Sequence, residues 1–165
     1  EPQRQARWRA RLDALPPGRR IGLIWSGNPL NGNNPTRALP RAQLAALAGL
    51  DDVQWISLQM GAEGRQAPPE GLSWHAWGDE IADFADTAAI VSQLDLLIST
   101  DTGPAHLAGA LGAPTWLLVQ RVPDWRWGLS GESCASYPSM RLFRQREQGD
   151  WASVMRAVRE ALLAG

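Results

Sequence analysis

The chain is short of several residue types, and each shortage removes a class of function. Its 165 residues include one cysteine, Cys134, and two histidines, His75 and His106. A single cysteine cannot form a disulfide within the chain, and so few thiols and imidazoles argue against a Cys/His metal site. No apolar run approaches the ~20 residues that span a bilayer. The net charge of −1 offers no basic surface for nucleic acid or anionic membranes.

Two common nucleotide-binding motifs are also missing. No G-x-G-x-x-G follows the first predicted strand, which argues against a dehydrogenase, and no GK[ST] is present, which argues against a phosphate-loop NTPase. The N-terminal segment is charged but lacks the apolar stretch of a signal peptide, so we expect a cytoplasmic location. It also lacks an initiator Met, which raises the question of whether the chain is a fragment of a longer protein.

What the chain does have is a regular alternation of strand and helix patterns. Its length, with 44% apolar and 20% charged residues, fits one globular domain. Short apolar runs predict strands at 19–25, 53–59, 72–77, 95–100, 114–120 and 140–145. Helices are predicted at 3–15, 40–50, 83–93, 105–112 and 150–164, the third with Phe84, Ala88 and Val91 on its packed face. This order predicts an α/β fold, a Rossmann-like three-layer α/β/α arrangement with a parallel sheet of about six strands. We divide the chain into a leading helix, 1–18, and the Rossmann-like domain, 19–165.

The sequence Asp101-Thr102-Gly103-Pro104 lies where a predicted strand meets a predicted helix. Ligands of doubly wound sheets bind at such corners. The free N–H groups of the first helical turn and the positive end of the helix dipole favour an anion there. Gly103 allows close approach to the backbone, while the Thr102 hydroxyl and a ring N–H of His106 can donate to the same anion. Asp101 is expected to hold loop amides or to accept from a ribose hydroxyl.

Two further features bear on this corner. Ala105, Ala108, Gly109 and Gly112 recur at helical spacing, which predicts a helix lying close to the sheet. Arg37 is the only cation in the predicted loop 26–38, and a guanidinium can bind a phosphate through two N–H groups. The alternatives are an ordinary turn with a helix cap at D-T-G-P and a solvated loop charge at Arg37.

The stretch "STDTGPAHLAGALGAPTWLL" closely resembles the nucleotide-sugar corner of GT-B glycosyltransferases of the heptosyltransferase type, glycosyltransferase family 9. It is closer still to the glycosyltransferase domain found behind tetratricopeptide repeats in many bacterial proteins. The resemblance extends to "IGLIWSGNP", "TRALP", "WISLQ", "DFADTAAIVSQLDLLIS", "PDWRW" and "YPSMRLFRQ", roughly residues 20–151. It implies that the chain is the C-terminal half of a GT-B fold.

The resemblance also implies roles for particular residues. The Asp-Thr-Gly…His corner of the family grips the diphosphate of the donor nucleotide, which corresponds to Asp101, Thr102, Gly103 and His106, and Arg37 stands where a basic residue contacts the phosphates. Possible nucleoside or sugar contacts, for which simple packing is the alternative, are Ser26, Gly27, Asn28, Gln59, Asp124 and Trp125, with Trp127 as a second candidate stacking wall.

The reaction implied is inverting transfer of a sugar from a UDP- or ADP-linked donor, without a metal or other cofactor. The acceptor would be a glycan, a lipid-linked sugar or a protein. No catalytic base stands out, because Asp79, Glu80 and Asp83 can simply be helix N-terminal charges. The base and the acceptor site are therefore expected in an N-terminal domain absent from this chain, which alone should be inactive. A non-catalytic nucleotide-binding or scaffold module of a tetratricopeptide-repeat protein is the main alternative, and a nucleotide-sugar epimerase is a third.

Overall fold

A computed structural model describes residues 1–165 and shows a six-stranded sheet whose strands all run parallel. The strands are β1 (Arg19–Ile24), β2 (Val53–Ser57), β3 (His75–Ala76), β4 (Leu96–Thr100), β5 (Thr115–Val119) and β6 (Met140–Arg144). Their order across the sheet is β3-β2-β1-β4-β5-β6, so the direction of winding reverses between β1 and β4. This is the switch point at which doubly wound sheets bind ligands.

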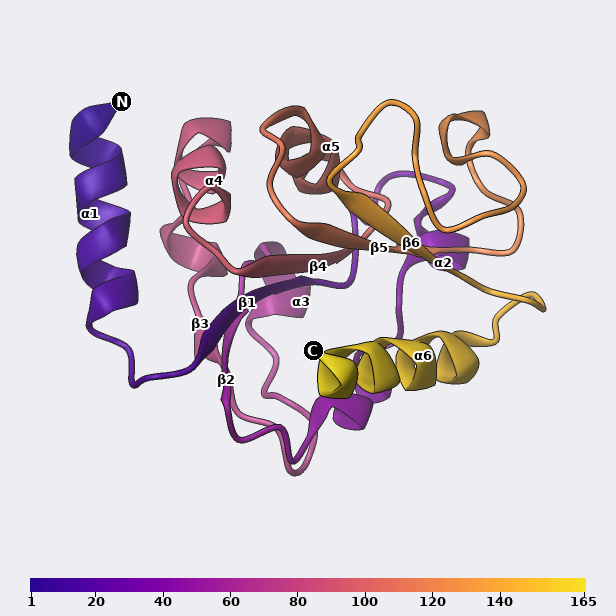
Figure 1. The fold of residues 1–165 in the computed structure, drawn as a ribbon, viewed down its shortest axis with the longest axis horizontal. Helices are drawn as coiled ribbons and strands as arrows, with labels where there is room; N and C mark the ends of the chain where they lie inside the picture. The colour runs from indigo at the N-terminus through magenta and orange to yellow at the C-terminus, as the bar shows by residue number, and fades with distance from the viewer.

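Helices cover both faces of the sheet, as predicted (Figure 1). The α-helices are α1 (Pro2–Asp13), α2 (Asn34–Arg37), α3 (Gly61–Gly64), α4 (Phe84–Val91), α5 (Gly103–Ala110) and α6 (Trp151–Ala164). Three short 3₁₀ helices are η1 (Arg41–Leu47), η2 (Gly78–Glu80) and η3 (Trp125–Trp127). In Figure 1, α1, α4 and α5 lie on one side of the strands and α6 on the other. The α/β/α architecture is thus confirmed. No helix is both long enough and apolar enough to cross a membrane.

Alternation along the strands produces the two cores. In β1, Ile21 and Leu23 join a cluster of 19 buried residues with η1 and α6, whereas Ile24 joins a cluster of 14 with α1 and α4. Because side chains alternate across a strand, each face receives its own apolar set. A third cluster of 7 residues lies under the long β5–β6 loop and includes Cys134 and Trp127.

Three expectations for single elements are wrong. The predicted helix 40–50 is the 3₁₀ helix η1, in which Leu44 and Leu47 are buried three residues apart, the period of that helix. The predicted strand 72–77 pairs only over β3, because Trp74 leaves the ladder and stacks on Trp25 with ring centroids 5.0 Å apart. Phe84 does not face the core but is 60% exposed at the first residue of α4.

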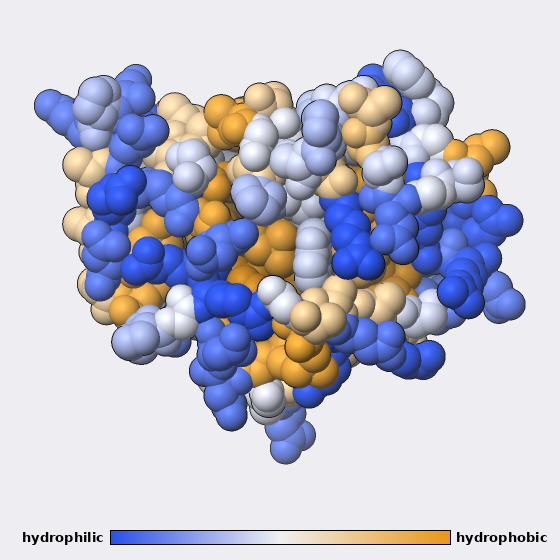
Figure 2. Space-filling view, viewed as in Figure 1, coloured by the Kyte–Doolittle hydropathy of each residue, from blue (hydrophilic) through white to orange (hydrophobic).

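Helix α1 is packed into the domain. Trp8 and Leu12 are 0% and 1% exposed and belong to the same cluster as the α4 core residues. The indole N–H of Trp8 donates to Asp86 of α4 at 2.9 Å, and the Trp8 ring lies 5.5 Å from that of Trp77. In Figure 2 the outer surface of α1, at the left, is predominantly hydrophilic. The leading helix therefore shares its core with the sheet.

Asp86 is a buried carboxylate with a complete set of partners. Besides the Trp8 indole, it accepts from the N–H of Ala82 at 3.0 Å, and the Arg4 guanidinium lies 3.3 Å away. The Trp8 hydrogen bond lowers the pKa of Asp86 most; the Ala82 N–H and the charges of Arg4 and Arg7 lower it further, against burial, which raises it.

Because the pKa of Asp86 is lower in the folded than in the unfolded chain, its ionised form stabilises the fold. That stabilisation is full above the unfolded-state pKa of about 3.9 and is lost as the pH falls through the lower native value. Below about pH 4, we expect the free energy of unfolding to fall less with decreasing pH in Asp86→Asn than in the wild-type protein, because asparagine does not titrate. Urea unfolding at a series of acid pH values measures this difference. Parallel pH curves for the two proteins would contradict this prediction.

Candidate functional site

Three of the predicted site residues meet around one hollow at the carboxyl edge of the sheet. A hollow of ≈ 630 Å³ is bounded by α2, by the residue after β4, and by the start of the β5–β6 loop. Arg37, Asp101 and Asp124 line it, together with Gln120, which the sequence analysis did not single out. A larger hollow, ≈ 970 Å³, lies between β6 and α6 and contains none of the predicted site residues. The smaller hollow is therefore the candidate site.

The corner after β4 presents unpaired backbone donors. Thr102 is the N-cap of α5 in an extended conformation, and its carbonyl accepts from the N–H groups of Ala105 at 3.1 Å and His106 at 3.3 Å. The N–H groups of Thr102 and Gly103 donate to no protein acceptor. They lie at the positive end of the helix, with Gly103 exposed. Such an arrangement favours an anion.

The Thr102 hydroxyl is engaged below this corner. It lies 3.0 Å from the hydroxyl of Ser99, whose single proton is directed at the Thr100 carbonyl at 2.8 Å. The Thr102 hydroxyl therefore donates to Ser99. Donation to a ligand, as the sequence predicts, requires this hydroxyl to rotate.

His106 has a polar neighbour at each ring nitrogen. Its Nε2 lies 3.3 Å from a carboxylate oxygen of Asp101, and its Nδ1 lies 3.2 Å from the Tyr137 hydroxyl. The ring packs against Trp127 with centroids 5.0 Å apart. Asp101 therefore lies beside the imidazole and accepts from no loop amide, which corrects that part of the expectation, while a ribose contact stays a prediction. No sequence signal pointed to Tyr137, the only tyrosine of the chain, because it lies 31 residues away in a loop without periodicity.

Arg37 carries a positive charge without a protein partner. It is the last residue of α2 and half-buried, its Nε is inaccessible and makes no hydrogen bond, and no carboxylate lies within ion-pair distance. Its guanidinium rests on Gly27, where an added Cβ would lie 3.5 Å from Nη2. A half-buried guanidinium without an anion costs desolvation energy, so its position favours a negatively charged ligand.

The loop after β1 is built by side-chain amides. Gln59 is 5% exposed; its oxygen accepts from the N–H groups of Trp25 and Ser26, and its nitrogen donates to the Ser26 carbonyl. Asn34 accepts from the Gly27 N–H at 2.8 Å and donates to the Ser26 hydroxyl at 3.2 Å. Gln59 thus fixes the end of β1, and a nucleoside contact from it stays a prediction. Asn34, which was missed, orients the helix that carries Arg37.

Asn28 and the β5–β6 loop lie nearer the surface. Asn28 is exposed and closes a turn by accepting from the Leu30 N–H. Asp124 caps η3, accepting from the backbone and guanidinium of Arg126, and this backbone hydrogen bond is the largest cause of its lowered pKa. Trp125 is 81% exposed, whereas Trp127 is buried against His106. Of the two tryptophans, Trp125 is the exposed one, and the Arg126 guanidinium lies over its ring at 5.0 Å from the centroid.

The small residues of α5 allow close packing against two different parts of the fold, the sheet and the β5–β6 loop. Ala105 and Ala108 are fully buried against the sheet, as expected. Gly109 instead faces the β5–β6 loop, because a Cβ there would lie 2.5 Å from Cγ of Tyr137. Gly112 is exposed with φ +69° and follows the end of the helix. The predicted close approach to the sheet is therefore correct for the alanines only.

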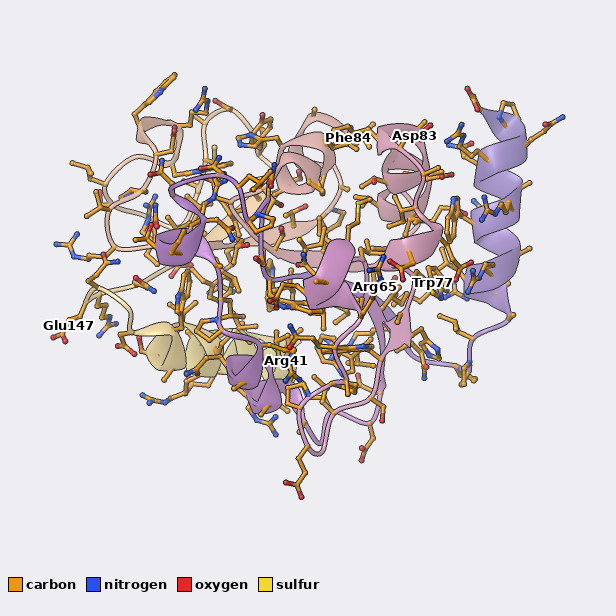
Figure 3. All side chains as sticks on the ribbon, turned by 180° about the vertical axis from the view of Figure 1, so that it is seen from behind. Arg41, Arg65, Trp77, Asp83, Phe84 and Glu147 are labelled. Carbon is orange, nitrogen blue, oxygen red and sulfur yellow. The ribbon has the colours of Figure 1, made fainter.

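The acidic residues considered as bases are paired with arginines. Asp79 binds Arg65, Glu80 binds Arg11, and Asp83 caps α4 and lies 2.5 Å from Arg4. Figure 3 shows Asp83 and Phe84 together at the start of α4. No three His, Cys, Asp or Glu side chains converge as a metal site.

Comparisons with known proteins find a family-model match over part of the chain and a shared fold. The family model described as Glycosyltransferase family 9 (heptosyltransferase) matches residues 82–127. Protein FlbA of Caulobacter vibrioides is 32% identical over 168 residues, which cover 98% of this chain and 28% of FlbA. The glycosyl transferase family 9 structure from Veillonella parvula aligns with a TM-score of 0.64 at 14% identity, over 98% of this chain and 50% of that one. The E. coli ADP-heptose LPS heptosyltransferase II aligns with a TM-score of 0.66 at 17% identity, over 99% and 51%.

The chain thus spans about half the length of the two solved relatives and little more than a quarter of FlbA. The matched segment contains Asp101, Thr102, Gly103 and His106, the residues that carried the resemblance in the sequence. The chain therefore contains a segment, residues 82–127, that matches the glycosyltransferase family 9 model, and its α/β fold is similar to that of the two solved heptosyltransferase-type structures.

Proposed function

We propose that this chain is the donor-binding half of an inverting, metal-independent GT-B glycosyltransferase, and that it binds the diphosphate of a nucleotide sugar. The observation that carries the proposal is the pairing of two kinds of unsatisfied donor at the switch point. The backbone N–H groups of Thr102 and Gly103 are free, and the Arg37 guanidinium has no counter-ion. Fixed donors of this kind stabilise the negative charge that a leaving diphosphate gathers, without a metal ion.

The hollow beside these donors suits the sugar. Apart from Val122 and Pro123 its lining is polar. The ionised Asp124 and the buried amide oxygen of Gln120, which has no hydrogen-bond donor, can accept from sugar hydroxyls. A UDP- or ADP-linked sugar in the cytoplasm is the donor that we propose.

A second domain is part of the proposal. Six of the eight large exposed apolar side chains lie in the loops or helix starts that follow the strands: Leu30, Met60, Phe84, Val122, Trp125 and Leu129. Apolar side chains gathered on one edge favour a partner surface there. We propose that an N-terminal half covers this edge and supplies the catalytic base and the site for the acceptor, a glycan, lipid-linked sugar or protein. Tetratricopeptide repeats would belong to the same polypeptide.

The second candidate is a non-catalytic nucleotide-binding or scaffold module. It is favoured by the pairing of Asp79, Glu80 and Asp83 with arginines, which leaves none of these carboxylates free to act as a base. That observation also weighs against an epimerase, which needs acid and base groups within this half.

Calorimetric titration with UDP, ADP and GDP tests the proposal. We expect saturable binding of one of the three, unchanged by a chelator, and weakened at least about tenfold in a Thr102→Ala/His106→Ala variant, because hydrogen bonds to a charged ligand are worth roughly 1.5–3 kcal/mol each. Circular dichroism checks that the variant is folded. Absence of binding by the folded wild-type chain would favour the scaffold instead.

A further inference from the structure

We propose that Tyr137 is a positioning residue that fixes the tautomer of His106, with the proton on Nε2 and the lone pair on Nδ1. The proposal rests on the diphosphate-binding function proposed above, since it concerns which ring nitrogen can donate to the ligand. It starts from the fact that His106 has a different kind of neighbour at each nitrogen.

The two neighbours select one neutral form of the ring. Asp101 presents a carboxylate oxygen 3.3 Å from Nε2, and an ionised carboxylate only accepts hydrogen bonds. The Tyr137 hydroxyl lies 3.2 Å from Nδ1 and can donate to a lone pair there. The neutral ring that satisfies both partners carries its proton on Nε2. In the opposite tautomer the Nε2 lone pair would face the Asp101 carboxylate, which is repulsive.

Tyr137 is held in place by its surroundings. Its ring lies against Gly109 of α5 so closely that a Cβ on Gly109 would be 2.5 Å from Cγ and 2.7 Å from Cδ1 of Tyr137. The Trp127 ring packs on His106 at 5.0 Å and lies 6.1 Å from the Tyr137 ring. The missing side chain at Gly109 thus admits the tyrosine ring beside α5, one helical turn after His106.

The consequence is a directed donor. Asp101 lines the hollow and lies 3.3 Å from Nε2 of His106, so Nε2 is the ring nitrogen on the side where the proposed ligand binds. A phosphate oxygen that reaches this N–H shares it with Asp101, whereas Nδ1 remains turned away and bonded to Tyr137. The role of Tyr137 is therefore to keep a donor, and not a lone pair, facing an anion.

Nitrogen-15 NMR of the imidazoles tests this directly, because the chain has only two histidines. At about pH 8, where model imidazoles are neutral, we expect the His106 spectrum of the wild-type protein to show a protonated Nε2 and an unprotonated, hydrogen-bonded Nδ1. Tyr137→Phe should shift the His106 Nδ1 resonance toward that of a nitrogen without a hydrogen bond. His75, whose Nε2 lies 3.2 Å from Gln54, should not change.

Ser139→Ala is the matched control, since it deletes a hydroxyl of the same loop that makes no hydrogen bond. A wild-type proton on Nδ1, or an Nδ1 resonance that is the same in Tyr137→Phe and wild type, would overturn the proposal. The NMR experiment needs no nucleotide, so its result stands whether or not the proposed function fails. If a nucleoside diphosphate does bind, Tyr137→Phe should weaken its binding about 3- to 10-fold in the wild-type protein. The same substitution should not weaken binding further in the His106→Ala variant, and equal effects in the two proteins would count against the proposal.

Discussion

Arg37→Met is expected to weaken binding of the preferred nucleoside diphosphate about 10- to 100-fold and to leave the thermal unfolding midpoint unchanged or raised. The affinity falls because the variant loses a hydrogen bond between charged groups, which is worth roughly 1.5–3 kcal/mol. In the wild-type protein the Arg37 guanidinium has no protein partner that competes with the ligand for it. Stability does not fall because the charge makes no ion pair in the protein, while methionine keeps much of the apolar stem.

Calorimetry gives the affinity, and scanning calorimetry without nucleotide gives the midpoint. The matched control is Arg9→Met, which removes an exposed, unpaired arginine of α1 far from the hollow. If Arg37→Met and Arg9→Met bind equally well, Arg37 is only a loop charge. If Arg37→Met unfolds at a clearly lower temperature, its guanidinium stabilises the fold and the argument from an unsatisfied cation fails.

Trp8→Ala is expected to destabilise the domain by about 3–5 kcal/mol, the usual cost of removing a large buried aromatic side chain. Two effects combine at this position. A cavity opens between α1 and α4 where Trp8 is 0% exposed, and the carboxylate of Asp86 loses the donor that lowers its pKa most. The loss of one of the donors to this buried carboxylate adds to the cost of the cavity.

Urea unfolding at neutral pH measures the effect, and Trp125→Ala is the control because it removes the same side chain from a position that is 81% exposed. The control should change the unfolding free energy by no more than about 0.5 kcal/mol. A similar, small change for Trp8→Ala would mean that α1 is not part of the cooperative unit, and that the division expected at residue 18 is a structural one.

The elements that could be predicted from the sequence are those with a clear local hydrophobic pattern. β1, β2, β4, β5 and β6 are short apolar runs buried on both faces, and α6 has a clear amphipathic period, so each was found to within a residue or two. The 72–77 strand failed because Trp74 packs on Trp25 in preference to extending the ladder, a tertiary contact that no local pattern encodes.

The candidate site likewise contains residues that the sequence singled out and residues that only the tertiary fold brings to it. Asp101, Thr102, Gly103 and His106 lie close together in one corner of the sequence, and Arg37 stands out as the only cation of its loop, so composition and spacing were enough to single them out as candidates. Tyr137 and Gln120 reach the site from the β5 side through the sheet topology. Gln59 was placed correctly at the end of β2, but its amide turned out to hold the backbone of β1, because a strand end with free N–H groups needs partners.

The contact between Trp8 and Asp86 has a consequence for synthesis. The two residues are 78 positions apart, so at about 5–20 residues per second Asp86 is made some 4–16 s after Trp8. During that interval α1 lacks the α4 surface on which Trp8 packs, and an isolated helix of 12 residues is only marginally stable in water. Helix α1 can therefore dock fully only once α4 has been made, whereas α6, at the other end of the domain, can dock on a sheet that is already complete.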